Sequence, residues 1–427
     1  MASSQGAPSV MPDTRLPTPN VWSVRLGLVC LSAVSVSLPM AWVSLAKVLV
    51  LAVSLAYLCV DYAKGRRDTA LGALWTTWIL ALIGVLFATS LLWTGADLPS
   101  ALNTLAKHIK VVEIVLLAVL IRTAAEARIG IAAYALGQAF LLLSSWLLFV
   151  GVPIPWKADS AVGYEVFSTY LDQSLMFATS ASVFWYLRRD KLWPSWAGVV
   201  LAVLALVNTL LVLEGRSGYL VALTAIALAI MWSMPRHLRL AALVVTPFVL
   251  FLGLTLGSAK VQERVTKVFQ ESQGFAQTHQ VSAKDSSAFR LNAWMQSVQA
   301  MQEKPLVGHG VGNWTPVVKR IQGSEADAIF GEGNHSNPHQ EYLLWGVELG
   351  VGGVLLLIGL FIGMARDAMR FPDTVKQAML AVVAATAVAC LFNSALYDDL
   401  MGDFFCVSLG LLMALGVRTT TAAKVPA

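Results

Sequence analysis

The chain has 427 residues, of which 57% are hydrophobic and only 13% are charged. A soluble domain carries about 25% charged residues to cover its exterior, so this composition excludes one or several water-soluble domains and predicts a membrane protein. The 30 lysines and arginines exceed the 25 aspartates and glutamates, for a formal charge of +5. In a membrane chain this surplus reports which loops face the cytoplasm, and we expect no nucleic-acid partner.

About twelve stretches of the chain are apolar over roughly the 20 residues that a helix needs to span a bilayer. In chain order they are residues 22–38, 42–60, 70–93, 104–122, 129–151, 165–187, 193–213, 217–234, 240–258, 342–364, 377–397 and 403–417. The sequence therefore predicts an all-α polytopic membrane protein in a lipid bilayer. The four cysteines lie inside these apolar runs, so no disulfide or zinc framework is expected.

Lysines and arginines gather in alternate loops, after the second, fourth, sixth, eighth and tenth predicted spans. Short cytoplasmic loops collect such residues, so both termini are expected in the cytoplasm. The predicted organisation is a cytoplasmic tail at 1–21, spans one to nine in 22–258, an outer loop domain at 259–341, spans ten to twelve in 342–417, and a cytoplasmic tail at 418–427. Within the outer loop domain, residues 285–304 predict an amphipathic helix that Ser286 or Ser287 can cap and that Pro305 ends.

Some basic residues on the outer face break this charge rule and require a reason. Arg216 stands in a tight turn between two apolar spans, where a cation is costly unless it is paired or serves a site. An ion pair with Glu214 or contact with lipid headgroups would explain Arg216, and an anionic phosphate ligand is the sharper alternative. Lys107 and Lys110, at the outer end of the fourth span, are expected to form a basic rim.

The segment that ends the outer loop contains a histidine suited to proton transfer. Pro338 disfavours a helical Asn337, so Asn337 is expected to cap a helix whose first turn includes His339, with Gln340 closing a capping box. The helix dipole there keeps the imidazole neutral, which suits a general base. The alternative is a histidine that only hydrogen-bonds at the membrane boundary. A zinc site shared with His335 is disfavoured, because Pro338 interrupts the helical spacing.

Other patterns are weaker on their own. The glycine-rich segment 305–312 neither follows a strand nor matches a P-loop, so a compact turn is expected and nucleotide binding is not. Three acids between the last two spans either hold a divalent cation or are simply solvated: Asp398, Asp399 and Asp403. Three acids within the spans are candidates for proton-relay or polar-network roles: Glu113, Asp172 and Glu348. We expect no bound metal and no cofactor.

Five motifs, in this order, resemble the O-antigen ligase superfamily, which also contains O-antigen polymerases and bacterial O-linked oligosaccharyltransferases. They are the turn Glu214–Gly218, Phe289–Trp294, Pro305–Gly312, Pro338–Tyr342 and Glu348–Gly352. The resemblance is firmest from about residue 205 to 365. In this family the residue after the histidine is more usually Asn, whereas this chain has Gln340. Both side chains end in an amide that can cap a helix or make a polar contact, but the glutamine side chain is longer.

The resemblance implies a fold like that of the GT-C glycosyltransferases and an inverting, metal-independent transfer of a glycan from undecaprenyl diphosphate. The active site would lie on the periplasmic face of a bacterial inner membrane. By position, Arg216 and Arg290 would hold the diphosphate and His339 would activate the acceptor. Independently of the resemblance, the basic rim of Lys107 and Lys110 would add contacts to the substrate. These assignments make Arg216, Arg290 and His339 the expected catalytic residues.

The expected acceptor is lipid A-core, as in a ligase of lipopolysaccharide biosynthesis, because the chain has a modest loop and no sizeable domain after the last span. An O-antigen polymerase or an O-linked protein oligosaccharyltransferase would differ only in acceptor. A secondary transporter of a lipid or an ion is an alternative of a different class. No convincing repeat between the two halves supports it.

Overall fold

The computed structural model describes residues 24–66, 68–190, 192–213, 215–257, 259–278, 286–323 and 337–423. Within these ranges the secondary structure is helical and no strand occurs. The predicted tails at 1–21 and at the extreme C-terminus, as well as Glu214 and His335, lie outside the described residues. The predicted fold class, an all-α polytopic membrane protein, is confirmed.

Nine helical segments in the described part of the chain are long and apolar enough to cross a membrane. They are α2 (Met40–Ala63), α4 with η1 (Trp75–Leu92), α7 (Ala124–Phe149), α9 with η3 (Ser195–Val212), α10 (Arg216–Ser233), η4 with α11 (Arg236–Gly257), α17 (Val351–Ala368), α18 (Asp373–Phe392) and α19 (Asp399–Ala422). Each coincides with one of the spans predicted from the sequence.

The other three of the about twelve predicted segments do not form helices that are long and apolar enough by themselves to cross a membrane. The first forms only the 12-residue α1 (Val24–Ser35). The span at 104–122 is divided into α5 (Leu98–Ile109), η2 (Lys110–Val112) and α6 (Glu113–Leu120). The segment at 165–187 gives α8 (Tyr170–Leu187), which is rich in hydroxyl residues and buried along most of its length among other helices.

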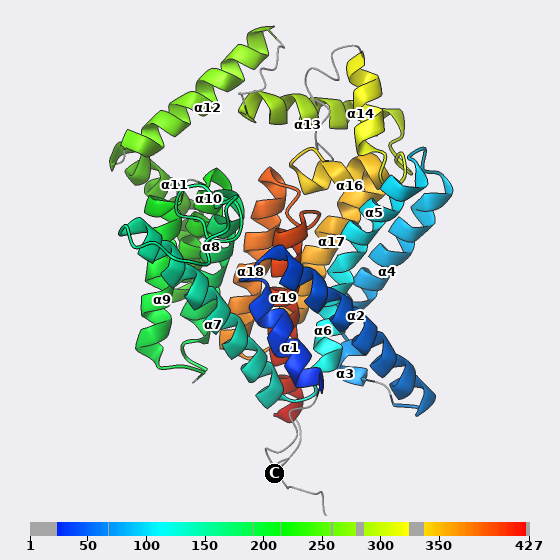
Figure 1. Cartoon of the computed structure of the whole chain (residues 1–427), viewed down its shortest axis with the longest axis vertical. Coiled ribbons are helices and arrows are strands. Elements are labelled where there is room, and N and C mark those ends of the chain that lie inside the picture. Colours follow the sequence, from blue (N-terminus) through cyan, green and yellow to red (C-terminus); the bar gives the residue numbers. More distant parts are fainter. Residues whose placement is uncertain are drawn as a thin grey trace, which may run out of the picture.

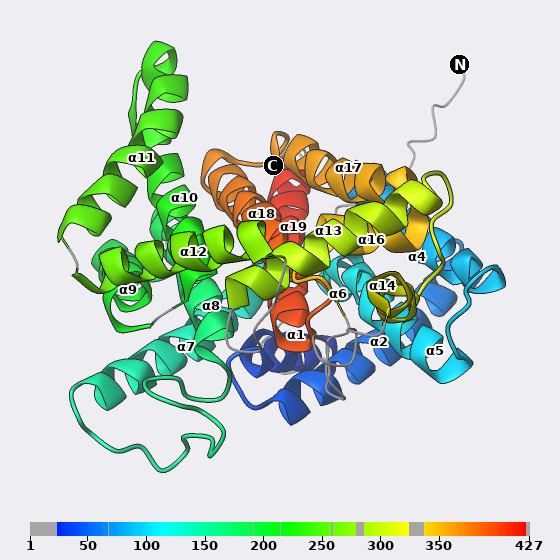
Figure 2. The ribbon, with the colours of Figure 1, turned by 90° about the horizontal axis from the view of Figure 1, so that it is seen from above.

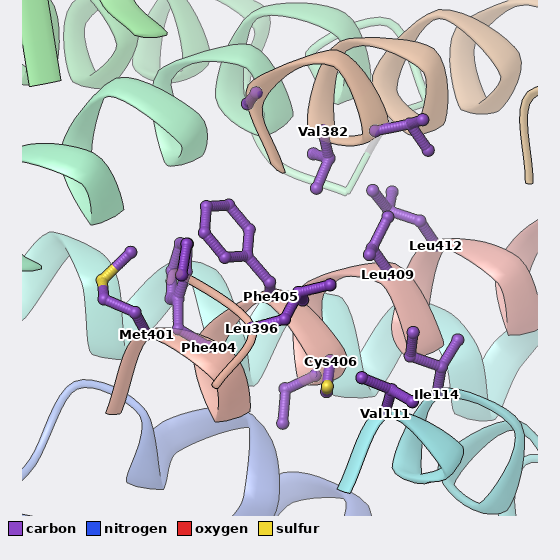
Figure 3. Packing of buried hydrophobic residues seen from close by; sticks show 14 of the residues in the cluster. Val111, Ile114, Val382, Leu396, Met401, Phe404, Phe405, Cys406, Leu409 and Leu412 are labelled. Carbon is purple, nitrogen blue, oxygen red and sulfur yellow. The ribbon is translucent and has the colours of Figure 1, made fainter. Parts of the chain in front are cut away.

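Helix α19 forms the centre of the bundle (Figure 1). In its most apolar stretch 94% of the residues are buried, whereas none is buried in the corresponding stretch of η4 and α11. Figure 3 shows Phe405, Leu409 and Leu412 of α19 beside Val382 of α18 and Ile114 of α6. Lipid is as apolar as these side chains, so close packing rather than escape from water stabilises this centre. The outer surface of α11 is therefore left to lipid.

A layer of three helices, which we call the capping layer, lies across one end of the bundle (Figures 1 and 2). It consists of α12 (Ala259–Thr278), α13 (Ser286–Glu303) and α14 (Trp314–Gln322). The amphipathic helix predicted at 285–304 is α13, with nearly the predicted ends. Helix α13 packs on both of its neighbours in this layer and on α16 (Glu341–Leu349) below it.

The glycine-rich segment after α13 forms a compact turn against the C-terminal end of α16. The amides of His309 and Gly310 donate to the carbonyls of Val347 and Glu348, at 2.8 and 2.9 Å. Gly308 has φ +67°, and a Cβ on it would lie 2.4 Å from the carbonyl of Glu348. Only glycine tolerates both the left-handed backbone and this approach. Two of the sequence motifs thus pack on each other, and the predicted span at 342–364 is broken into α16 and α17 at Gly350.

Candidate functional site

Arg216 is the first residue of α10, on the side of the bundle that faces the capping layer. Its Nη1 donates to the Ser287 hydroxyl at the start of α13, at 2.9 Å. The glycines around Arg216 let α10 approach α8 closely, because a Cβ on Gly215 or Gly218 would lie within 2.4 Å of the Ser174 Oγ. The tight turn therefore places Arg216 where a transmembrane helix meets the capping layer.

Arg290 lies in the second turn of α13, close to Arg216. Its Nη2 donates to the Asn393 Oδ1 at 3.4 Å. Burial lowers the pKa of Arg290, and the positive charge of Arg216 lowers that pKa further. Two guanidinium groups that repel each other in a partly dry place favour an anionic ligand between or beside them.

Arg216 and Arg290 both line a cavity of about 410 Å³. It lies between α10, α11, α12 and α13, and most of its lining is apolar. The apolar lining includes Leu220, Leu223, Phe251, Leu254, Val261, Val265, Val268, Phe269, Leu291, Trp294 and Phe392, and the polar lining includes Ser287. The cavity thus joins an apolar wall to two cations, which suits an amphiphile with an anionic head.

His339 does not lie in the first turn of a helix, and the prediction that Asn337 caps that helix was wrong. Helix α16 begins at Glu341, and the side chain of Gln340 caps it by accepting from the amide of Leu343 at 2.6 Å. Asn337 instead accepts, through Oδ1, from the amide of His339 at 2.9 Å. An Asn side chain readily forms such a turn with the backbone two residues on.

The backbone of His339 is in the left-handed region, with φ +52°. Such a conformation is uncommon for a residue other than glycine and persists where surrounding contacts impose it, often at functional sites. Asn337 and the capped start of α16 supply those contacts on either side. The imidazole is therefore held just before the N-terminal end of α16.

Helix α13 carries or contacts each of the three expected catalytic residues. Its Ser287 contacts Arg216, it carries Arg290, and the ring of its Phe289 meets the His339 ring edge to face, with centroids 6.1 Å apart. The indole of Trp294 on the same helix donates to the carbonyl of Pro338 at 3.0 Å. The two guanidinium groups line the cavity, whereas His339 is not among its lining residues.

The two lysines expected as a basic rim lie elsewhere. Lys110 is only 7% exposed, and its ammonium donates to the carbonyls of Tyr397 and Asp398. Lys107 pairs with Asp399 at 3.0 Å and lies over the Tyr397 ring. Neither lysine lines the cavity. Both lysines instead fasten α5 and η2 to the connection between α18 and α19, so the contacts of Lys107 and Lys110 give no support to a basic rim at this cavity.

The three acids at the end of this connection and the start of α19 have separate partners. Asp398 caps α19 by accepting from the amide of Met401 at 3.1 Å, Asp399 pairs with Lys107, and Asp403 pairs with Lys47 at 2.8 Å. Across the part of the chain that the structure describes, no group of three or more His, Cys, Asp or Glu residues could hold a metal ion. The expectation that these acids are simply solvated is wrong for Asp403, which is 1% exposed and pairs with Lys47 inside the bundle.

Two other acids that the sequence singled out have structural contacts. Asp172 forms a capping box with Thr169 at the start of α8. Glu348 accepts from the amide of Gly312 at 2.9 Å, and its other oxygen lies 2.6 Å from the His108 Nε2. Glu348 therefore links α16 to the glycine-rich turn and to α5.

Two residues that connect the site, Glu341 and Asn393, carry no signal in the sequence that marks them as functional. Glu341, fully buried, accepts from the amides of Leu396 and Tyr397 and from the Trp345 indole. Asn393, at the end of α18, contacts both α13 and α10. Apart from Trp345, their partners are far away in the sequence, so no local pattern could have revealed those contacts.

A family model described as O-antigen ligase matches residues 200–358. The matched region includes α10, the capping layer, α16 and hence Arg216, Arg290 and His339. A search of curated proteins found no match to the chain. Residues 200–358 are thus similar to the O-antigen ligase family, and the family resemblance of the motifs is confirmed over this region.

Proposed function

We propose that the protein is an inverting glycosyltransferase that moves O-antigen glycan from undecaprenyl diphosphate to lipid A-core. One observation carries this proposal: two close guanidinium groups, Arg216 and Arg290, line a cavity whose other walls are mostly apolar. An isoprenoid tail is apolar and its diphosphate is anionic, so the donor matches both parts of this lining. The family match over the same residues supports the assignment.

The arginines would act on the leaving group. As the bond between the sugar and the diphosphate breaks, negative charge grows on the diphosphate. Guanidinium groups bind phosphate oxygens through paired, charge-assisted hydrogen bonds, and cations already in place stabilise this developing charge. Arg216 and Arg290 would thereby supply the positive charge that a divalent cation provides in other glycosyltransferases.

His339 would act on the acceptor. A sugar hydroxyl is a poor nucleophile until a base takes its proton, a step worth about 10² to 10⁴ in rate. In the proposed step His339 accepts the hydroxyl proton, the oxygen attacks the anomeric carbon, and undecaprenyl diphosphate leaves from the opposite face. One displacement of this kind inverts the anomeric configuration. The hydrogen bond from the His339 amide to Asn337 and the ring contact with Phe289 support a fixed place for the base.

We further propose that the capping layer lies in the periplasm and that both termini lie in the cytoplasm of a bacterial inner-membrane protein. Helix α10 starts at Arg216 beside the capping layer, so its other end, followed by Arg236 and Arg239, lies on the opposite side. Arg418 lies near the far end of α19 in the same way. Basic residues at that end favour the cytoplasm.

The test is transfer by the purified protein, with undecaprenyl diphosphate-linked glycan as donor and separate reactions for each acceptor. Product with lipid A-core supports a ligase, product with a second donor molecule indicates a polymerase, and product with a pilin-like peptide indicates protein glycosylation. A chelator should leave the rate unchanged. Absence of transfer to every acceptor would contradict the proposal.

Variants assign the roles within this assay. Arg216→Ala and Arg290→Ala should each abolish donor binding and transfer, whereas His339→Ala should bind donor normally and stop turnover. Arg320→Ala is a matched control, because Arg320 lies in the capping layer on α14 and its side chain is 59% exposed. Equal losses of donor binding and turnover in His339→Ala would indicate a structural role for the histidine.

A further inference from the structure

Asn393 connects the two elements that carry the arginines. It follows the last residue of α18, and it is 6% exposed. Its Oδ1 accepts from the Arg290 Nη2 at 3.4 Å, and its Nδ2 donates to the Ser217 Oγ at 2.8 Å. One amide therefore joins α13, through Arg290, to the start of α10, immediately after Arg216.

The partner of Arg290 is neutral. No Asp or Glu of the residues described forms an ion pair with Arg290, and the charged neighbour that most affects its pKa is another cation, Arg216. A guanidinium that only had to be stable in a protein would gain more from a carboxylate, since charge-assisted bonds are roughly twice as strong as neutral ones. The amide orients Arg290 and leaves its positive charge uncompensated.

We propose that Asn393 is a positioning residue whose neutral amide fixes Arg290 while preserving its charge for the diphosphate of the donor. This inference rests on the proposed function, because it assigns a reason for the amide only if Arg290 binds an anion. It also predicts that a negative charge at position 393 weakens binding of the anionic head of the donor but does not lower the stability of the empty protein.

The informative change is Asn393→Asp, which keeps the size of the side chain and an acceptor for Arg290 but adds a negative charge. The carboxylate would pair with Arg290 and could still accept a hydrogen bond from the Ser217 hydroxyl. The empty protein should therefore be at least as stable as the unchanged protein. The diphosphate would then meet a neutralised arginine and a like charge, and its Kd should rise at least about tenfold.

Asn393→Leu is the matched uncharged variant, because it removes both hydrogen bonds without adding a charge. It should lower the thermal midpoint, since it leaves buried polar groups without their partner. It should also weaken donor binding, but by less than Asn393→Asp. A purely structural role predicts the reverse order, because the aspartate retains the shape and the acceptor that the leucine lacks.

The experiment measures the thermal midpoint, the Kd for undecaprenyl diphosphate and the separate values of kcat and KM for each purified variant. We expect the Kd and KM for the donor to increase from unchanged protein to Asn393→Leu to Asn393→Asp, with a smaller effect on kcat. A normal Kd in Asn393→Asp, or a loss of folded protein in that variant, would overturn the inference.

Arg290→Ala separates this inference from the proposed function. If Arg290→Ala weakens binding of undecaprenyl diphosphate and Asn393→Asp does not, the role of Asn393 is wrong and the donor site stands. If Arg290→Ala binds the donor normally, the donor site itself is wrong, and the inference falls with it.

Discussion

Glu341 offers a test of how the site is held together, because it is the first residue of α16 and follows His339 and Gln340 directly. One carboxylate oxygen accepts from the amides of Leu396 and Tyr397, at 3.0 and 3.1 Å. The other oxygen accepts from the Trp345 indole at 2.8 Å. The side chain is fully buried, so no water can replace these bonds. Glu341 thereby fixes the start of α16 to the connection that follows Asn393.

The expected cost of removing this carboxylate follows from the three bonds. Glu341→Ala leaves three buried donors unpaired, and each costs about 1–3 kcal/mol, for a total of about 3–9 kcal/mol. Glu341→Gln retains one oxygen for the two backbone amides but turns an amide donor toward the Trp345 indole, so one bond is lost, at about 1–3 kcal/mol. The loss in stability should therefore be clearly larger for Ala than for Gln.

The same residue predicts a dependence on pH. Burial raises the pKa of Glu341 in the folded protein. A carboxyl whose pKa is higher in the folded than in the unfolded state binds its proton more tightly in the folded state. Its protonation therefore increases the stability of the folded protein as the pH falls from the raised pKa to the ordinary pKa of a glutamate. Glu341→Gln should lose this contribution in that pH window.

The assay is thermal unfolding of the purified variants in detergent over a series of pH values, with glycan transfer measured in parallel. Glu341→Ala should unfold at the lowest temperature and lose transfer. A midpoint for Glu341→Ala equal to that of the unchanged protein, or a Gln variant less stable than the Ala variant, would refute the reasoning from the three bonds.

Three further predictions concern other parts of the chain. Gly308→Ala should destabilise the protein by about 1–3 kcal/mol in thermal unfolding, because Gly308 has φ +67° and the added Cβ would lie 2.4 Å from the Glu348 carbonyl. Gly359→Ala is the control and should not change the stability, because no atom lies within 4 Å of the added Cβ. Lys47→Met should cost about 3–5 kcal/mol by leaving the Asp403 carboxylate buried without its partner, and adding Asp403→Asn should restore stability. Asn337→Ala removes the acceptor that holds the backbone of the site histidine, so kcat should fall while the Kd for undecaprenyl diphosphate stays unchanged; an equal change in both quantities would contradict this role.

The sequence predicted those parts of the fold that depend on long apolar runs. Nine spans and the helix at 286–303 were predicted because lipid demands about 20 apolar residues and because Pro305 marks the end of the surface helix. The family motifs also located Arg216, Arg290 and His339. In the structure Arg290 lies on α13, and Arg216 and His339 contact residues of α13.

The departures from the expected pattern have physical causes that local sequence patterns do not reveal. Helix α8 is buried by its neighbours and therefore tolerates more polar residues than a lipid-facing span. The side chains of Asn337 and Gln340 can both cap a helix. Because Asn337 accepts from the amide of His339 in a turn, Gln340 is the residue that caps α16. The roles of Lys110 and Asn393 depend on partners more than 100 residues away.

The most direct test of the central claim is a structure of His339→Ala bound to undecaprenyl diphosphate-linked glycan. We predict that the diphosphate contacts the guanidinium groups of Arg216 and Arg290, with the isoprenoid chain in the cavity between α10 and α11. A diphosphate bound away from both arginines, or at the end of the bundle opposite the capping layer, would contradict the proposed donor site.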